Sequence, residues 1–117
     1  MLAKLVIDDL RILNLPGDVQ YARTVDDALA ALAEKGSWEE LWLDHDLGDK
    51  TGKEETIWPV IAEIEQRMAY RPFYFGQIFI ISSNPVGSQH MKLTLDHLGY
   101  STTILDPKPY LASVLPW

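Results

Sequence analysis

The feature that most constrains the fold is a series of short apolar runs, each followed by acids or small polar residues. The strongest runs cover residues 4–8, 40–44 and 77–82, and weaker ones cover residues 19–23 and 101–105. The first run, KLVID, shows no alternation of apolar and polar side chains, which is typical of a strand buried on both faces of a parallel sheet. The sequence therefore predicts five strands.

Helices are predicted in the intervals that follow the second, third and fourth strands. Thr24 is a favourable N-cap for the first helix, and Gly36 is expected to end it. The second helix is predicted over residues 56–68, and the third from its cap Ser88 to Leu98. The resulting order indicates an α/β fold, a small doubly wound, flavodoxin-like parallel sheet of five strands with helices on both faces.

The link between the first two strands is too short for an ordinary crossover. It covers about ten residues and contains Pro16-Gly17, a strong turn signal. A parallel crossover usually needs a dozen or more residues and a helix. Either the first helix is reduced to a turn or these strands pair differently, and we expect the reduced helix.

Length, charge and cysteine usage narrow the functional classes. A chain of 117 residues predicts a single domain over residues 1–117. It has no apolar run of membrane-spanning length and no signal-peptide pattern, and it lacks cysteine, so we expect a cytoplasmic protein. The net charge of −7 argues against an extended nucleic-acid surface, but a nucleotide or an RNA end held through a metal fits.

Four polar clusters follow the predicted strands. They are Asp8-Asp9, the loop that begins at Asp44, residues 82–84, and Lys108. Because parallel strands point their carboxyl ends one way, these clusters should meet at one edge of the sheet, where such folds bind ligands.

The acids form an oxygen-only set. Asp8, Asp9 and Asp44 suit Mg²⁺, Mn²⁺ or Ca²⁺ rather than zinc, and Asp46 is either a further ligand or a support for one. A divalent cation would relieve the repulsion among these carboxylates. The alternative is a solvated acidic loop.

Neutral and basic groups near the same edge suit phosphate. Ser82, Asn84 and the amides near Gly87 precede a helix, where anions bind, although a plain turn explains them equally well. His45 lies between two acids and either moves a proton or orients a carboxylate. His90 is expected to face the same opening, and Lys108 to neutralise a phosphoryl oxygen.

Three stretches carry a family resemblance. They are IDDLR at residues 7–11, LDHDLG at 43–48 and ISSNPVG at 81–87. With them, the chain resembles response-regulator receiver domains and, more closely, the cyclic-phosphate processing receiver-like family. The receiver pattern also includes Gly52 and Lys108-Pro109, and the resemblance covers about residues 4–98.

The resemblance implies particular roles for these residues. Asp44 matches the phosphoacceptor position, Asp8 and Asp9 the metal pair, Ser82 the switch hydroxyl and Lys108 the receiver lysine. A histidine is expected where this chain has Ile81, so an acid-base group of the family is missing. The complete assignment is catalytic for His45, Asp44 and Lys108, ligand-binding for Arg11, Ser82, Asn84, Gly87 and His90, and metal-binding for Asp8, Asp9, Asp44 and Asp46.

Three functions follow from this assignment, in order of preference. The first is a metal-dependent phosphoesterase that acts on cyclic phosphates of nucleotides or RNA ends. The second is a catalytically silent binding protein for a small phosphorylated ligand, or one that docks on a protein partner or a second copy of itself. The third is a signalling receiver in which Asp44 accepts a phosphoryl group.

Overall fold

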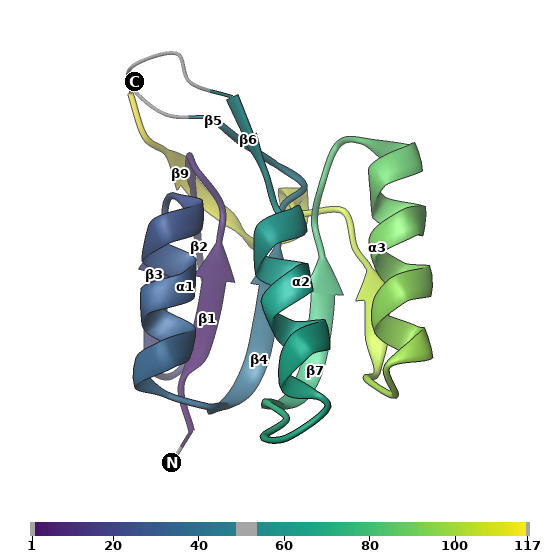
Figure 1. Ribbon diagram of the computed structural model, residues 1–117. Helices are drawn as coiled ribbons and strands as arrows, with labels where there is room; N and C mark the ends of the chain where they lie inside the picture. Colours follow the sequence, from purple (N-terminus) through teal and green to yellow (C-terminus); the bar gives the residue numbers. More distant parts are fainter. Residues whose placement is uncertain (1, 49–53, 117) are drawn as a thin grey trace.

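A parallel sheet forms the centre of the computed structural model, which describes residues 2–48 and 54–116 (Figure 1). Gly52 lies outside these residues. Five parallel strands are adjacent in the order β3-β1-β4-β7-β8. Their bounds are Lys4–Ile7 (β1), Val19–Ala22 (β3), Ser37–Leu43 (β4), Tyr74–Ile80 (β7) and Thr102–Ile104 (β8). The predicted five-stranded α/β sheet is therefore confirmed.

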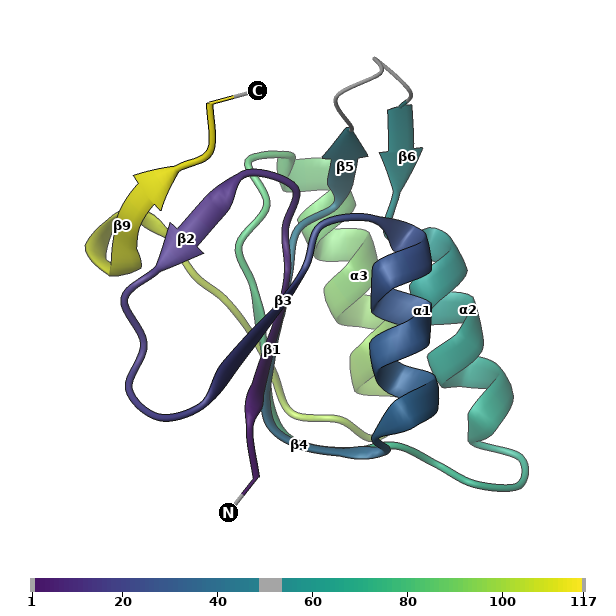
Figure 2. The ribbon, with the colours of Figure 1, turned by 90° about the vertical axis from the view of Figure 1, so that its left-hand side faces the viewer.

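The helices of the described chain lie together on one face of this sheet (Figure 2). They are α1 (Val25–Glu34), α2 (Trp58–Arg67) and α3 (Pro85–His97). Their buried side chains form one core with inward-facing strand residues such as Leu5, Leu41 and Ile78. No helix of the described chain is both long and apolar enough to cross a membrane.

A two-stranded ribbon, rather than a helix, packs on the opposite face. Strand β2 (Arg11–Leu13) pairs antiparallel with β9 (Leu111–Val114), which follows a 3₁₀ turn, η1 (Lys108–Tyr110). This face has its own apolar cluster, in which Val6, Trp42 and Ile81 are buried with Leu13 of the ribbon. The expectation of helices on both faces is therefore wrong. The helices α1, α2 and α3 all lie on the other face (Figure 2), and among the described residues no helix of eight or more residues occurs before α1 or after α3.

The short first link pairs its flanking strands as expected but contains no helical turn. β1 and β3 are parallel neighbours, with Leu5 opposite Gln20. Between them the chain forms β2 and then a turn at Gly17, whose φ of +86° favours glycine. The reduced helix is thus replaced by a strand, whose backbone groups find partners in β9.

The ends of the helices follow local capping chemistry. Thr24 caps α1 as predicted, since its side chain accepts a hydrogen bond from the Asp27 amide. The predicted start of α3 at Ser88 is wrong. Asn84 is the N-cap and Pro85 the first helical residue, a combination that starts a helix well, so the amides near Gly87 belong to the first turn.

A hairpin that the sequence analysis did not predict follows the Asp44 strand. Strand β5 (Asp46–Gly48) pairs antiparallel with β6 (Glu54–Thr56), with Asp46 opposite Thr56. The backbone after Asp46 is therefore held in a strand instead of an open loop.

Candidate metal and phosphate site

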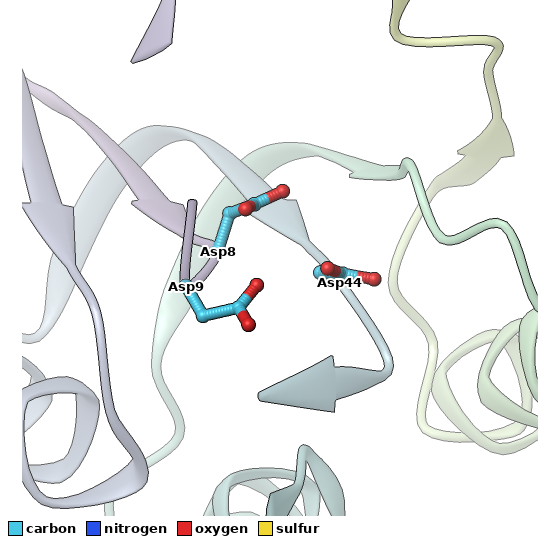
Figure 3. A group of neighbouring side chains, drawn as sticks. All are labelled: Asp8, Asp9 and Asp44. Carbon is cyan, nitrogen blue, oxygen red and sulfur yellow. The ribbon is translucent and has the colours of Figure 1, made fainter. Parts of the chain in front are cut away.

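Three carboxylates meet where β1 and β4 end (Figure 3). Asp8 and Asp9 directly follow β1, Asp44 directly follows β4, and these strands are neighbours in the sheet. One oxygen of each carboxylate lies within 4.8 Å of an oxygen of the others. Asp8 is 0% and Asp44 7% exposed, so both charges are placed in the protein interior. The predicted convergence of these three acids is confirmed.

Backbone amides orient each of the three carboxylates. Asp8 Oδ1 accepts hydrogen bonds of 2.9 Å from the amides of Leu10 and Arg11. Asp44 Oδ1 accepts one of 2.8 Å from the amide of the next residue. Asp9 Oδ2 accepts one of 3.1 Å from the Gly48 amide in the hairpin. These bonds hold the carboxylates in position before any ligand arrives.

Arg11 is the cation of the site. Its Nη1 lies 2.7 Å from Asp8 Oδ2 and 3.4 Å from Asp44 Oδ2. Arg23 holds the turn behind it, because its guanidinium donates to the carbonyl oxygens of Asp8 at 3.1 Å and Arg11 at 2.6 Å. The single positive charge of this guanidinium compensates the charge of one of the two buried carboxylates, and it leaves the charge of the other carboxylate uncompensated.

Burial, together with the uncompensated charge, makes Asp44 hard to ionise. Burial and the neighbouring charge of Asp8 raise the pKa of Asp44 to about 7, although Arg11 and the His45 amide act in the opposite direction. Burial and Asp8 also raise the pKa of Asp9. At neutral pH, Asp44 therefore takes up a proton readily unless a cation favours its charged form.

A divalent cation fits this set of donors. The donors are carboxylate oxygens, which Mg²⁺, Mn²⁺ and Ca²⁺ prefer, and they lie close enough to share one ion. They border a pocket of about 340 Å³, from which a ligand can reach them together with Arg11 and Ser83.

Asp46 borders the same pocket but lies outside the close group of three. Its side chain is 63% exposed, and its Oδ1 lies 2.9 Å from Nδ1 of His45. The contact orients the imidazole ring of His45, which is not one of the predicted metal ligands, so both roles predicted for Asp46 stay predictions.

The ring of His45 packs against the helices. A Cβ atom on Gly87 would lie 2.5 Å from its Cδ2, so α3 approaches the ring this closely only because residue 87 is glycine. Trp58 of α2 packs edge-on to the ring, with ring centroids 6.2 Å apart, and the His90 ring lies against Trp58 at 4.5 Å with a tilt of 50°. The described residues that line the acidic pocket include no histidine. The roles predicted for His45 and His90 stay predictions, and the geometry indicates that His45 positions the loop after β4.

Ser82 and Asn84 are engaged in local structure. Ser82 Oγ accepts a hydrogen bond of 3.0 Å from the Asn84 amide, and Asn84 Oδ1 accepts one of 2.9 Å from the Gly87 amide. Ser83, which the sequence analysis placed in the same polar cluster without giving it a role, lines the acidic pocket. The sequence signal for a site role of Ser83 was its position directly after the end of the predicted strand and next to Ser82.

Lys108 and Ile81 are not among the residues that line the acidic pocket. Lys108 is exposed on η1 and borders a second pocket, whereas Arg11 is the cation that reaches Asp44. Ile81 is fully buried in the apolar cluster under the ribbon. The position where the family resemblance leads us to expect a histidine is thus a core position in this protein.

Comparison with known proteins gives one family. A family model described as the cyclic-phosphate processing receiver domain matches residues 3–97. No curated protein and no solved structure shows a significant match to the chain.

Proposed function

The chain belongs to the family of cyclic-phosphate processing receiver domains, and on that premise we propose that it opens cyclic phosphates of nucleotides or RNA ends with the help of a divalent metal ion. The observation that carries this proposal is the group of three carboxylates with Arg11 beside it. Buried acids at this spacing are costly without a cation, and a cation that holds them also attracts phosphate.

The residues of the chain have distinct tasks in this proposal. Asp8, Asp9 and Asp44 bind the ion, which is Mg²⁺ or else Mn²⁺ or Ca²⁺. A bound ion of this kind neutralises phosphate charge and activates water. The guanidinium of Arg11, with its side chain 21% exposed, donates to a phosphoryl oxygen at the pocket while it stays paired with Asp8.

Ring opening is the direct test. The protein is incubated with a 2′,3′-cyclic nucleotide and Mg²⁺ or Mn²⁺, and the phosphorus NMR signals of ring and monoester are followed. We expect opening by the parent protein, no opening in EDTA or by Asp8→Asn, and parental rates for Asp18→Asn, an exposed acid in a loop. Binding of the nucleotide without ring opening would reject the enzymatic function for this substrate class.

The histidine variant separates two roles. A general acid or base contributes about 10²- to 10⁴-fold to a rate, so His45→Gln should cost that much if the ring moves a proton. If the ring only positions the loop, as its packing against Gly87 indicates, the loss should be less than tenfold and should be accompanied by weaker binding.

A second candidate function is binding without turnover. The observation that favours it is the buried Ile81 at the histidine position, together with the lack of a histidine among the described residues that line the acidic pocket. In that case the acids and Arg11 hold a cyclic phosphate that the protein sequesters. Ile81→His then tests whether the missing group restores ring opening.

A further inference from the structure

We propose that a second pocket, of about 540 Å³, binds the nucleoside part of a ligand whose phosphate lies at Arg11. This inference rests on the function proposed above and assigns a binding site to the nucleoside part of its ligand. The pocket lies between the ends of β7 and β8 and the strand β9, and Asp8, Asp9 and Asp44 are not among the residues that line it.

The walls of this pocket are mainly aliphatic. Ile81 and Leu105 are buried or half-buried there, and Ile104 and Leu111 expose 36% and 39% of their surface. Partly exposed aliphatic side chains around one hollow provide apolar surface that a ligand can cover. The volume lies within the range of about 300 to 1,000 Å³ that is usual for small-molecule sites.

The pocket adjoins the acidic pocket. Arg11 and Ser83 line both, so one molecule can occupy the two hollows with its middle beside the guanidinium. Arg11 is held there by its contact of 2.7 Å with Asp8, which keeps the cation at the boundary. With the proposed ion bound at the acids, an anionic group is favoured beside Arg11, and the rest of the ligand then faces the aliphatic side chains.

Polar groups at the rim favour a nucleoside over an alkyl chain. Ser82, Ser83 and Asp106 border the pocket, and the Asp106 side chain accepts a hydrogen bond of 3.0 Å from the Lys108 amide, which fixes the turn that carries both residues. Hydroxyl and carboxylate groups suit the ribose hydroxyls and the amino groups of a base, whereas an alkyl chain would cover them without offering a partner. The aliphatic walls then pack on the faces of the base.

Calorimetry with two monoesters tests the proposal without any turnover. The probes are adenosine 3′-monophosphate and methyl β-D-ribofuranoside 3-phosphate, which has a methoxy group in place of the base, each titrated in Mg²⁺. We expect adenosine 3′-monophosphate to bind ten- to a hundredfold tighter, the gain for roughly 60 to 110 Å² of apolar surface removed from water. Ile104→Ala and Leu111→Ala should each remove at least threefold of this preference and leave the methyl riboside unchanged.

The control is Leu93→Ala, which removes an aliphatic side chain of 68% exposure on α3 outside both pockets. Equal affinity for the two probes, or an equal effect of Leu93→Ala and Ile104→Ala, overturns the inference. Ring opening of the 2′,3′-cyclic nucleotide and of methyl β-D-ribofuranoside 2,3-cyclic phosphate, measured separately, decides the proposed function. Opening without a preference for the base rejects the nucleoside pocket alone. A preference that depends on Ile104, without opening of any ring, supports the pocket and rejects the esterase.

Discussion

Asp44 should make the protein less stable as the pH rises, provided that no divalent ion is present. Its pKa is 3.8 in an unperturbed chain and about 7 in the folded protein. Between these values the folded state keeps a proton that the unfolded chain has lost, so the free energy of unfolding falls as the pH rises to about 7 and is level above it. At 1.36 kcal/mol per unit, the penalty at pH 8 is about 4 kcal/mol.

Asp44→Asn should remove this penalty. Asparagine cannot ionise, and its Oδ1 can still accept the hydrogen bond from the His45 amide, while Arg11 keeps its shorter contact with Asp8. In EDTA, the variant should be about 1.6 kcal/mol more stable than the parent at pH 5 and about 4 kcal/mol more stable at pH 8, so its advantage should grow by about 2.7 kcal/mol between the two pH values. Urea unfolding at the two pH values, followed by tryptophan fluorescence, measures the difference.

Magnesium should remove most of the stability advantage of the variant at pH 8. An ion at 100 times its dissociation constant stabilises the parent by about 2.7 kcal/mol, and the variant, which lacks one ligand, should gain little. Asp18→Asn, at an exposed loop position, should follow the parent throughout. A variant that is less stable than the parent at pH 8 in EDTA would show that the Asp44 charge is well compensated, which would refute this reasoning.

Three further changes test other parts of the site. Gly87→Ala should destabilise the fold by about 1 to 3 kcal/mol in urea unfolding, because its Cβ would overlap the His45 ring, and His45→Ala in the same chain should recover most of the loss; no recovery would place the strain elsewhere. Arg11→Gln should tighten Mg²⁺ binding about tenfold or more in calorimetry by removing a competing charge, yet weaken binding of adenosine 3′-monophosphate; weakening of both would make Arg11 a purely structural residue. Asn84→Ala should lower the free energy of unfolding by about 1 kcal/mol through loss of the α3 cap, and an unchanged value would contradict the capping role.

The sheet and the acids could be predicted because local patterns determine them. An apolar run without alternation indicates a strand buried on both faces, and Leu5 and Leu41 are indeed 0% exposed. Asp8 and Asp44 come directly after two such strands, and parallel neighbours bring their carboxyl ends together. The convergence of the acids then follows from topology alone.

Contacts between distant segments left no local signal. Residues 11–13 and 111–114 pair across nearly the whole chain, and neither stretch is long enough to indicate a strand by itself. The orientation of His45 depends on the missing Cβ of Gly87, so the sequence showed a histidine between acids but not that α3 would hold its ring. The helix cap at Asn84 could not be distinguished from a turn in the sequence, because Asn-Pro is typical both of a turn and of the start of a helix.

The ribbon of β2 and β9 links the shape of the fold to its candidate site. Where a doubly wound sheet would carry helices on its second face, this chain places a ribbon over the ends of the strands (Figure 2). β2 brings Arg11 to Asp8 and Asp44, and β9 brings Leu111 to one pocket and Val114 to the other. The bond of 2.8 Å from the Leu115 amide to the Leu10 carbonyl extends the ribbon to the residue directly after the acid pair. The element that replaces the helices on this face therefore supplies both the cation beside the acids and part of the wall of each pocket, so the helix-free second face and the construction of the site have one structural cause.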